Sequence, residues 1–361
     1  MGKLSNKLST KQSPFLIINK NLILIKMNKS NILKYIGNLS QIGTCRHYTL
    51  SDGWARGMRA TDINTGSGLQ YTVLPDRGLD ISLASFKGKN LVYLTCNGET
   101  HPAYFEHENI GWLRTFAGGL LTTCGLTHFG PPSTDDGEEL GLHGRYSTLP
   151  VKQFADVSEW VGDEYHFKVR GIVEEGFLFG KKLRMEREIS SIQGQNKILI
   201  TDKITNFGNA ASPYTILYHM NLGYPLLSED AELVIDPLET KPRDADAAVG
   251  IAEFRNFIEP QPTYNEQVFF HTMKGNSMGK TEVALRNKEM GVELKINFNI
   301  NQLPYLTQWK MMGHGEYVLG IEPCNILCKS RRTLREENSL PMLQPGESTL
   351  NIIEVSLNEI I

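Results

Sequence analysis

The sequence predicts an all-β protein built from large antiparallel sheets. From about Gly37 to the end of the chain, short segments with alternating apolar and polar residues recur between Gly, Pro, Asn and Asp turn signals. Long apolar patterns with the 3.6-residue period of an amphipathic helix are scarce. Because so many strands exceed what one open sheet usually holds, we expect two packed sheets.

The clearest expected strands share a period of two, and they cover residues 68–74, 165–173, 182–189, 197–204 and 348–356. Alternation on both sides of the polar connection at 190–196, which contains Gly194, predicts a long antiparallel hairpin. A further turn is expected at 206–209, where the strand after this hairpin ends. Segment 103–117 is a candidate for a helix, and segment 330–338 is expected to be a charged loop or a short helical turn.

The first 30 residues differ from the remainder of the chain. Lysines recur among them, and the first acidic residue of the whole chain is Asp52. The apolar stretch 15–25 is too short and too polar to span a bilayer, and Met27 is a candidate start of translation. We therefore expect residues 1–30 to be a basic extension outside the core and residues 31–361 to form one β-sandwich domain.

Composition narrows the function classes. The chain of 361 residues carries 37 Lys and Arg against 40 Asp and Glu, a net charge of −3, so it lacks the basic excess that nucleic-acid binding requires. The odd number of cysteines indicates reduced thiols and a cytoplasmic protein: Cys45, Cys96, Cys124, Cys324 and Cys328. Neither a phosphate-binding loop, a dinucleotide fingerprint nor a hydrolase motif is present, and we expect no cofactor and no metal.

Two ionisable residues lie within segments that otherwise have the pattern of buried strands. His219 lies in the apolar run 213–223, and Glu322 lies in 317–323, just before Pro323. Burying an unpaired charge costs several kcal/mol, and such groups are common at functional sites. A hydrogen-bonded core histidine and a structural salt bridge are the alternative interpretations of the two residues.

Three further residues are candidates for binding a ligand. His143 lies between glycines in 140–145, beside Arg145, where the backbone can approach a ligand closely. Arg77 lies between two strand-like segments, and its guanidinium is suited to hold vicinal hydroxyls. An ordinary loop histidine, and an ion pair of Arg77 with a neighbouring aspartate, explain these residues equally well.

Four motifs, taken in order, resemble the galactose mutarotase (aldose 1-epimerase) superfamily: 75–80 (PDRGLD), 141–144 (GLHG), 218–222 (YHMNL) and 320–323 (GIEP). The resemblance runs from about residue 40 to the end and implies a β-supersandwich with its site in a groove on one sheet. It also implies roles for four residues. His219 would be the general acid, Glu322 the general base, Arg77 the substrate-holding arginine and His143 a second, hydroxyl-binding histidine.

The chain departs from the family pattern at several positions, including Arg145 after the His-Gly pair and Cys324 after Glu-Pro. The acidic residue that binds substrate in the family has three candidates here, namely Asp236, Glu239 and Asp244. The expected substrate-binding residues are Arg77 and His143 together with Arg145, Asn221, Arg243, Gln308 and Trp309.

The expected function is that of an aldose 1-epimerase-like isomerase (mutarotase) that binds a small sugar or sugar derivative, which includes a modified, acidic or keto sugar, and interconverts its anomers. Two alternatives stay open. In one, His143, His219 and Glu322 bind a divalent metal in a sugar isomerase; in the other, the protein binds sugar without catalysis. We expect no membrane or nucleic-acid partner, and a homodimer is possible.

Overall fold

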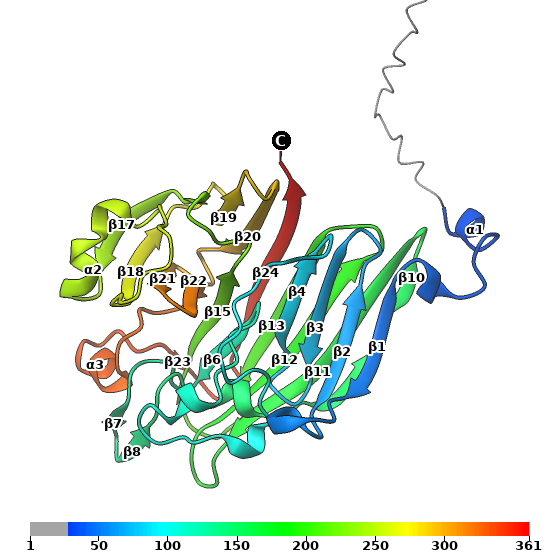
Figure 1. Ribbon diagram of the computed structural model, residues 1–361. Coiled ribbons are helices and arrows are strands. Elements are labelled where there is room, and N and C mark those ends of the chain that lie inside the picture. The colour runs from blue at the N-terminus through cyan, green and yellow to red at the C-terminus, as the bar shows by residue number, and fades with distance from the viewer. Residues whose placement is uncertain (1–27, 361) are drawn as a thin grey trace, which may run out of the picture.

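The computed structural model describes residues 28–360, and Figure 1 shows a sandwich of antiparallel sheets with a few short helices at its periphery. The predicted all-β class is confirmed. Residues 1–27 of the predicted extension lie outside the described residues. The next residues belong to α1 (Lys29–Ile32), and the backbone N–H of Lys29 donates to Asp163 Oδ1 at 3.1 Å.

The larger sheet of the described chain has nine strands. Eight follow one path in the order β10 (Glu159–Val161), β11 (Glu164–Gly176), β12 (Lys182–Ile192), β13 (Lys197–Asn206), β24 (Ser348–Glu359), β20 (Val292–Asn299), β19 (Lys280–Asn287) and β16 (Ala231–Val234), while β9 (Lys152–Asp156) also pairs with β11. The predicted hairpin is confirmed, since β12 and β13 pair with Glu188 opposite Thr201. The strands expected from alternation at 165–173, 182–189, 197–204 and 348–356 correspond to β11, β12, β13 and β24.

Two smaller sheets form the other layer. One has the order β17 (Pro237–Pro242), β18 (Gln267–Met273), β21 (Tyr305–Gly313), β22 (Glu316–Cys324), β15 (Thr215–Gly223) and β6 (Thr122–Leu126). The second has the order β1 (Thr44–Thr49), β2 (Arg59–Asn64), β3 (Leu69–Leu74), β4 (Asp80–Phe86) and β5 (Lys89–Asn90). A bridge between Ile81 and Leu121 joins β4 to the start of β6, so the two sheets continue each other across the layer.

Short elements lie outside these sheets. The strand pairs are β7 (Ser133–Asp135) with β8 (Glu138–Leu140), and β14 (Ser212–Pro213) with β23 (Met342–Leu343). The helices after α1 are α2 (Ala245–Val249) and α3 (Arg331–Glu336), and α3 decides between the charged loop and the short helical turn expected at 330–338. Segment 103–117 contains only 3-10 turns. Among residues 28–360, each helix is too short to cross a membrane.

Strand β15 is buried on both faces, which explains its nearly continuous apolar sequence. Tyr218 and Met220 point into the main core between the layers. Leu217, on the opposite face, packs in a second apolar cluster with Trp112 and Phe116. Because side chains alternate between faces along a strand, His219 points to this outer side with Leu217.

A buried network of charged and polar groups crosses the core between the two layers. Arg187 of β12 is fully buried and donates two hydrogen bonds to Asp202 of β13, at 2.8 and 2.7 Å. It donates a third to Asp80 of β4 at 2.9 Å. Asp202 also accepts from the hydroxyl of Tyr218 at 2.8 Å, and Asp80 accepts from the hydroxyl of Thr123 at 2.7 Å. The network therefore connects β12 and β13 to β4, β6 and β15.

Removing one member should destabilise the whole fold, because the remaining charges would be buried without a partner. We expect Asp202→Asn to lower the free energy of unfolding by about 3–5 kcal/mol, measured by denaturant titration. The matched control is Glu354→Gln, which removes the half-buried partner of the exposed Lys197 and should cost less than about 1 kcal/mol. Equal losses in the two variants would contradict a central role for this network.

Candidate active site

His219 and Glu322 face each other across two adjacent strands. The register of β15 and β22 pairs Leu217 with Cys324 and Met220 with Ile321, so His219 lies opposite Glu322. Their Nε2 and Oε1 atoms are 3.3 Å apart, and the residues are only 5% and 3% exposed. Two residues that are 103 positions apart in sequence thus form one buried pair.

The pair retains unused hydrogen-bonding capacity. The Nε2–Oε1 distance is within ion-pair range, but the angles do not make a hydrogen bond, and among the described residues Glu322 Oε1 and His219 Nδ1 have no hydrogen-bond partner. Unpartnered buried polar atoms are uncommon in native proteins because each costs free energy. These two atoms are the unsatisfied polar atoms of the pair.

Burial favours the uncharged form of both groups. It lowers the pKa of His219 well below its usual range, and the neighbouring His143 lowers it further. Burial raises the pKa of Glu322 well above its usual range; the carboxylate of Glu266 raises it further, and Arg243 opposes this. Burial therefore favours a neutral imidazole beside a protonated carboxyl group.

Aromatic rings surround the imidazole of His219. Phe116 and Trp309 lie 5.3 and 5.5 Å from it between ring centroids, and Trp112 lies at 6.4 Å. The ring of His143 lies at 5.7 Å and is almost perpendicular to that of His219. The wall of the site is thus apolar and flat on several sides, with two imidazoles and a carboxyl group as its polar groups.

His143 is held in place by its backbone and one hydrogen bond. Its φ of 59° is left-handed, and its Nδ1 lies 2.8 Å from the carbonyl oxygen of Phe129. The next residue must be glycine, because a β-carbon at Gly144 would lie 2.1 Å from the carbonyl oxygen of His128. Burial lowers the pKa of His143 to about 4, so its ring is neutral and its Nε2 can accept a hydrogen bond when Nδ1 donates.

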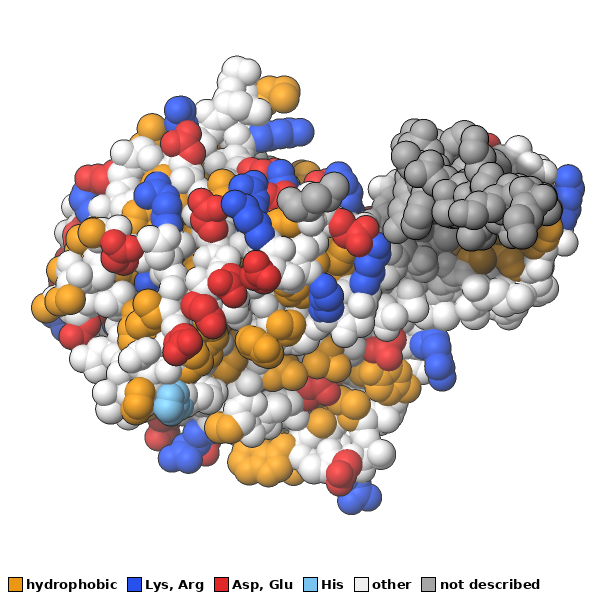
Figure 2. Space-filling model, turned by 45° about the horizontal axis from the view of Figure 1, so that its top comes forward, with side chains coloured by type: hydrophobic (Ala, Val, Ile, Leu, Met, Phe, Trp, Pro, Cys, Tyr) orange, Lys and Arg blue, Asp and Glu red, His pale blue; other side chains and the backbone are white. Residues whose placement is uncertain are grey.

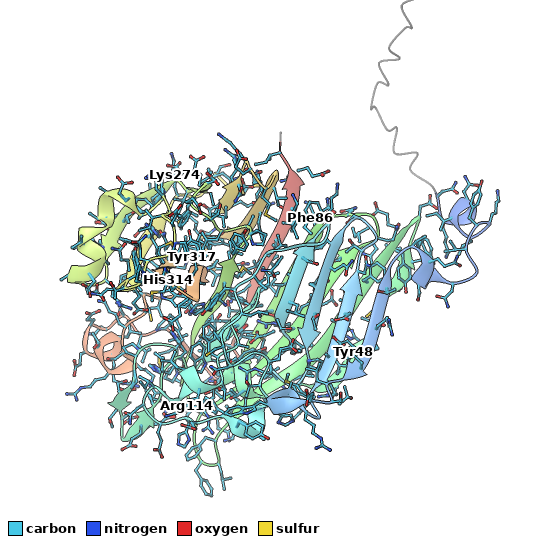
Figure 3. The ribbon with its side chains drawn as sticks, viewed as in Figure 1. Tyr48, Phe86, Arg114, Lys274, His314 and Tyr317 are labelled. Atoms are coloured by element: carbon cyan, nitrogen blue, oxygen red, sulfur yellow. The ribbon has the colours of Figure 1, made fainter. Side chains whose placement is uncertain are left out.

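A groove with a volume of about 820 Å³ lies next to the pair. Its lining includes Phe116 and Trp309, the two rings nearest to His219, together with Arg243, Glu266 and His314. Figure 3 labels His314, which lies in the turn between β21 and β22. His219 and Glu322 are not among the lining residues; Phe116 and Trp309 contact both the groove and the imidazole of His219.

Glu266 is a residue that sequence reasoning missed. It accepts from the indole Nε1 of Trp309 at 2.9 Å and from Arg243 at 2.8 Å, so it orients both side chains in the groove. Arg243 also donates to Asp244 at 2.7 Å. In the sequence, Glu266 is marked only as an acidic residue directly before strand β18 and close to the aromatic Tyr264. Because it lies in a loop, no periodic pattern indicates where its side chain points.

Two predicted binding residues point elsewhere. Gln308 precedes Trp309 on β21 and therefore faces the core, where it donates to the carbonyl of Phe254 at 2.7 Å and lies 3.1 Å from His271 Nε2. Arg145 lines a separate groove with Glu138. This geometry gives no support to a sugar contact by Gln308 or Arg145.

Arg77 and Asn221 are buried and already partnered. Arg77 donates to the carbonyl of Thr100 at 2.9 Å, and burial lowers its pKa to about 10. Asn221 Nδ2 donates to the carbonyls of Gly119 and His219 at 3.1 and 2.9 Å. Asn221 therefore supports the strand that carries His219, while its Oδ1 has no partner among the described residues.

The three acidic candidates differ in their surroundings. Asp236 pairs with Lys274, and its side chain is 81% exposed. Glu239 pairs with Lys241 on the outer strand β17. Asp244 caps α2 and contacts Arg243, so it is the one of the three that reaches a groove residue.

The chain matches one protein family by sequence and several solved structures by fold. The sequence profile of the family described as a domain of unknown function (DUF4432) matches residues 55–357. The chain belongs to this family. No curated protein sequence matches it.

Solved structures similar to this DUF4432 protein share the sandwich. A protein of Klebsiella pneumoniae, provisionally named an aldose 1-epimerase, is 26% identical, with a TM-score of 0.79 over 88% of this chain and 83% of that one. A galactose mutarotase-like protein of Clostridium acetobutylicum is 10% identical, with a TM-score of 0.63 over 89% of this chain and 100% of that one. A galactose 1-epimerase of Lactobacillus acidophilus is 12% identical, with a TM-score of 0.60 over 88% of this chain and 100% of that one. The predicted resemblance to the galactose mutarotase superfamily is confirmed, and the fold is the mutarotase-like one.

The ligand atoms of His143, His219 and Glu322 are not grouped as those of a metal site. Within residues 28–360, one set of three His, Cys, Asp or Glu residues places its ligand atoms within 4.8 Å of one another, and it lies on β1 and β9.

The raised pKa of Glu322 has a consequence for stability. A carboxyl group whose pKa is higher in the folded state stabilises the fold at low pH, and this contribution is lost as the pH rises above its unfolded pKa of about 4.5. Glu322→Gln removes the titration, so the variant should gain stability relative to the wild type between pH 4 and pH 7.5. Thermal unfolding of both proteins at the two pH values measures this difference.

The matched control is Glu359→Gln, at a carboxylate that is 64% exposed and pairs with Lys87. It should not reproduce the pH-dependent gain. A Glu322→Gln variant that loses stability relative to the wild type as the pH rises would contradict the raised pKa.

Proposed function

We propose that this protein is an isomerase of the aldose 1-epimerase type, which interconverts the anomers of a small sugar in the groove beside His219 and Glu322. The observation that carries the proposal is the 3.3 Å approach of one imidazole and one carboxyl group at a buried position beside an open groove. Such a pair can act as acid and base on one substrate.

The surroundings of the pair fit a sugar ring. Phe116 and Trp309 offer flat apolar surfaces for the less polar face of a pyranose, and His143 offers a nitrogen for a hydroxyl group. The named activities of the similar structures, aldose 1-epimerase and galactose 1-epimerase, support the same class of reaction.

The proposed reaction needs one base and one acid. Glu322, as carboxylate, takes the proton of the anomeric hydroxyl, while protonated His219 donates a proton to the ring oxygen. The bond between C1 and the ring oxygen breaks and leaves an open-chain aldehyde. Rotation about the C1–C2 bond presents the other face of the carbonyl. Closure with the proton transfers reversed gives the other anomer.

The resting pair supplies both forms without a proton from solvent. A protonated carboxyl group beside a neutral imidazole has the same number of protons as a carboxylate beside an imidazolium. Transfer of one proton from Glu322 to His219 therefore produces the base and the acid together. A polar sugar that replaces water in the groove and bonds to both groups stabilises this charged form.

The charges of the groove bear on the choice of sugar. Arg243 is already paired with Asp244 and Glu266, so an acidic sugar would have to displace one of these carboxylates. A neutral aldose requires no such exchange. On the face that Figure 2 shows, acidic and basic side chains are interspersed. A cytoplasmic location and a homodimer stay predictions.

Substitution of either member of the pair should slow anomer exchange strongly. We expect His219→Asn and Glu322→Gln each to lower kcat by about 10²–10⁴-fold, because each removes one proton-transfer group. The measurement is NMR exchange spectroscopy of a panel of neutral hexoses, uronic acids and keto sugars at equilibrium. The control is His166→Asn, which removes a histidine on β11 that lies 3.9 Å from Glu164.

Two results would count against the proposal. If every sugar in the panel exchanges at the buffer rate with wild-type protein, the enzyme activity has no support. If a sugar exchanges and both variants match the wild type, the roles of His219 and Glu322 are wrong. Equal sugar binding by wild type and Glu322→Gln, without exchange by either, would indicate a binding module.

Trp309 should act on binding more than on the chemical step. We expect Trp309→Leu to raise KM by about 3–10-fold with a smaller effect on kcat, because the lost aromatic contact is worth about 0.5–1.5 kcal/mol. Trp160→Leu, on the distant strand β10, is the matched control and should leave KM unchanged. A large fall in kcat with unchanged KM would show that Trp309 instead positions the catalytic pair.

A further inference from the structure

Three potential metal ligands meet at the outer edges of the two layers, on strands that do not contribute to the groove. Cys45 and His47 are two residues apart on β1, the edge strand of the five-stranded sheet. Asp156 is the last residue of β9, which pairs with β11 in the nine-stranded sheet. The sulfur, a ring nitrogen and a carboxylate oxygen of these residues all lie within 4.8 Å of one another.

The imidazole of His47 is oriented by the neighbouring strand. Thr61 lies opposite His47 in the register of β1 and β2, and its hydroxyl is 2.8 Å from Nδ1. This contact leaves Nε2 directed at Asp156 Oδ2, at 3.3 Å. Nitrogen and oxygen ligands of a tetrahedral zinc ion are about 3.4 Å apart, given metal–ligand bonds of about 2.0–2.2 Å. A hydrogen bond to the second ring nitrogen is the usual support of a metal-binding histidine.

The carboxylate of Asp156 is oriented by Ser158 on one oxygen and by His47 on the other. Its Oδ1 accepts from the backbone N–H and the hydroxyl of Ser158, at 2.9 and 2.5 Å. Its Oδ2 faces His47, and in the described part of the chain this is the sole ion pair of Asp156. No lysine or arginine in residues 28–360 neutralises this carboxylate by direct pairing.

The thiol of Cys45 completes the set. A bound divalent metal stabilises the thiolate form of a cysteine ligand. The side chains of His47 and Asp156 are 43% and 32% exposed, so solvent can reach the site and a water molecule can occupy a fourth position.

We propose that Cys45, His47 and Asp156 form a zinc-binding site that connects β1 to β9. A thiolate, an imidazole and a carboxylate suit Zn²⁺ in tetrahedral geometry. The ligands come from both layers of the sandwich, so the ion would link the two sheets at their edges. Tyr48, labelled in Figure 3, follows His47 on β1 and marks this edge of the molecule, away from His314 in the groove.

The test uses the full chain, first stripped of metal, with Zn²⁺ and Co²⁺ as probes. We expect one equivalent of Zn²⁺ in equilibrium dialysis, and a thiolate-to-cobalt charge-transfer absorption with Co²⁺. Cys45→Ser should abolish this absorption. Loss of a residue that hydrogen-bonds to a metal ligand typically weakens metal binding by about 10–100-fold. Because His47 is a direct ligand, His47→Asn should weaken Zn²⁺ binding by more than this. Zn²⁺ should also raise the melting temperature of the wild type but not of the two variants.

Three control variants separate this site from others. Cys96→Ser removes an exposed thiol elsewhere, His166→Asn removes a histidine near a carboxylate, and His219→Asn removes a ligand candidate in the groove. All three should bind Zn²⁺ as the wild type does. A cobalt–thiolate absorption that persists in Cys45→Ser, or is lost in His219→Asn, would overturn the proposal, as would the absence of Zn²⁺ binding by wild-type protein whose circular dichroism shows that it is folded.

Discussion

The geometry of this protein depends on the buried ion pairs that the guanidinium group of Arg187 makes with two aspartates. It binds Asp202 and Asp80 in the core, and these carboxylates in turn bind Tyr218 on β15 and Thr123 on β6. Tyr218 precedes His219, so the hydrogen bond on the core face of β15 fixes which residues lie on the outer face. A slip by one residue would put His219 into the core and leave Asp202 without the Tyr218 hydroxyl.

The same sandwich explains the unusual state of the pair on the outer face. Strands β15 and β22 are covered by the main core on one side and by the cluster around Trp112 on the other, so His219 and Glu322 are almost without water. Loss of hydration favours the neutral form of each group. In the reaction that we propose, the two neutral partners become an ion pair by one proton transfer when a polar substrate compensates the charges.

The sequence predicted the most regular parts of this arrangement. Alternation was sufficient for the hairpin of β12 and β13, and the rarity of ionisable residues in apolar strands was sufficient to select His219 and Glu322. Alternation did not assign the faces of β21, because both of its faces are covered by other residues. Gln308 and Trp309 were therefore selected together, although only Trp309 faces the groove. Glu266 was missed because it lies before a strand, and its role follows from contacts with Trp309 and Arg243 that depend on the tertiary structure.

In the proposed reaction, His219 and Glu322 act on opposite sides of the bond between C1 and the ring oxygen of a sugar. The most direct test of these roles is a crystal structure of the Glu322→Gln protein soaked with the sugar that wild-type protein interconverts. We predict that the anomeric hydroxyl lies within hydrogen-bond distance of residue 322 and the ring oxygen within hydrogen-bond distance of His219 Nε2. A sugar that is bound in the groove with neither oxygen near these two side chains would contradict the account.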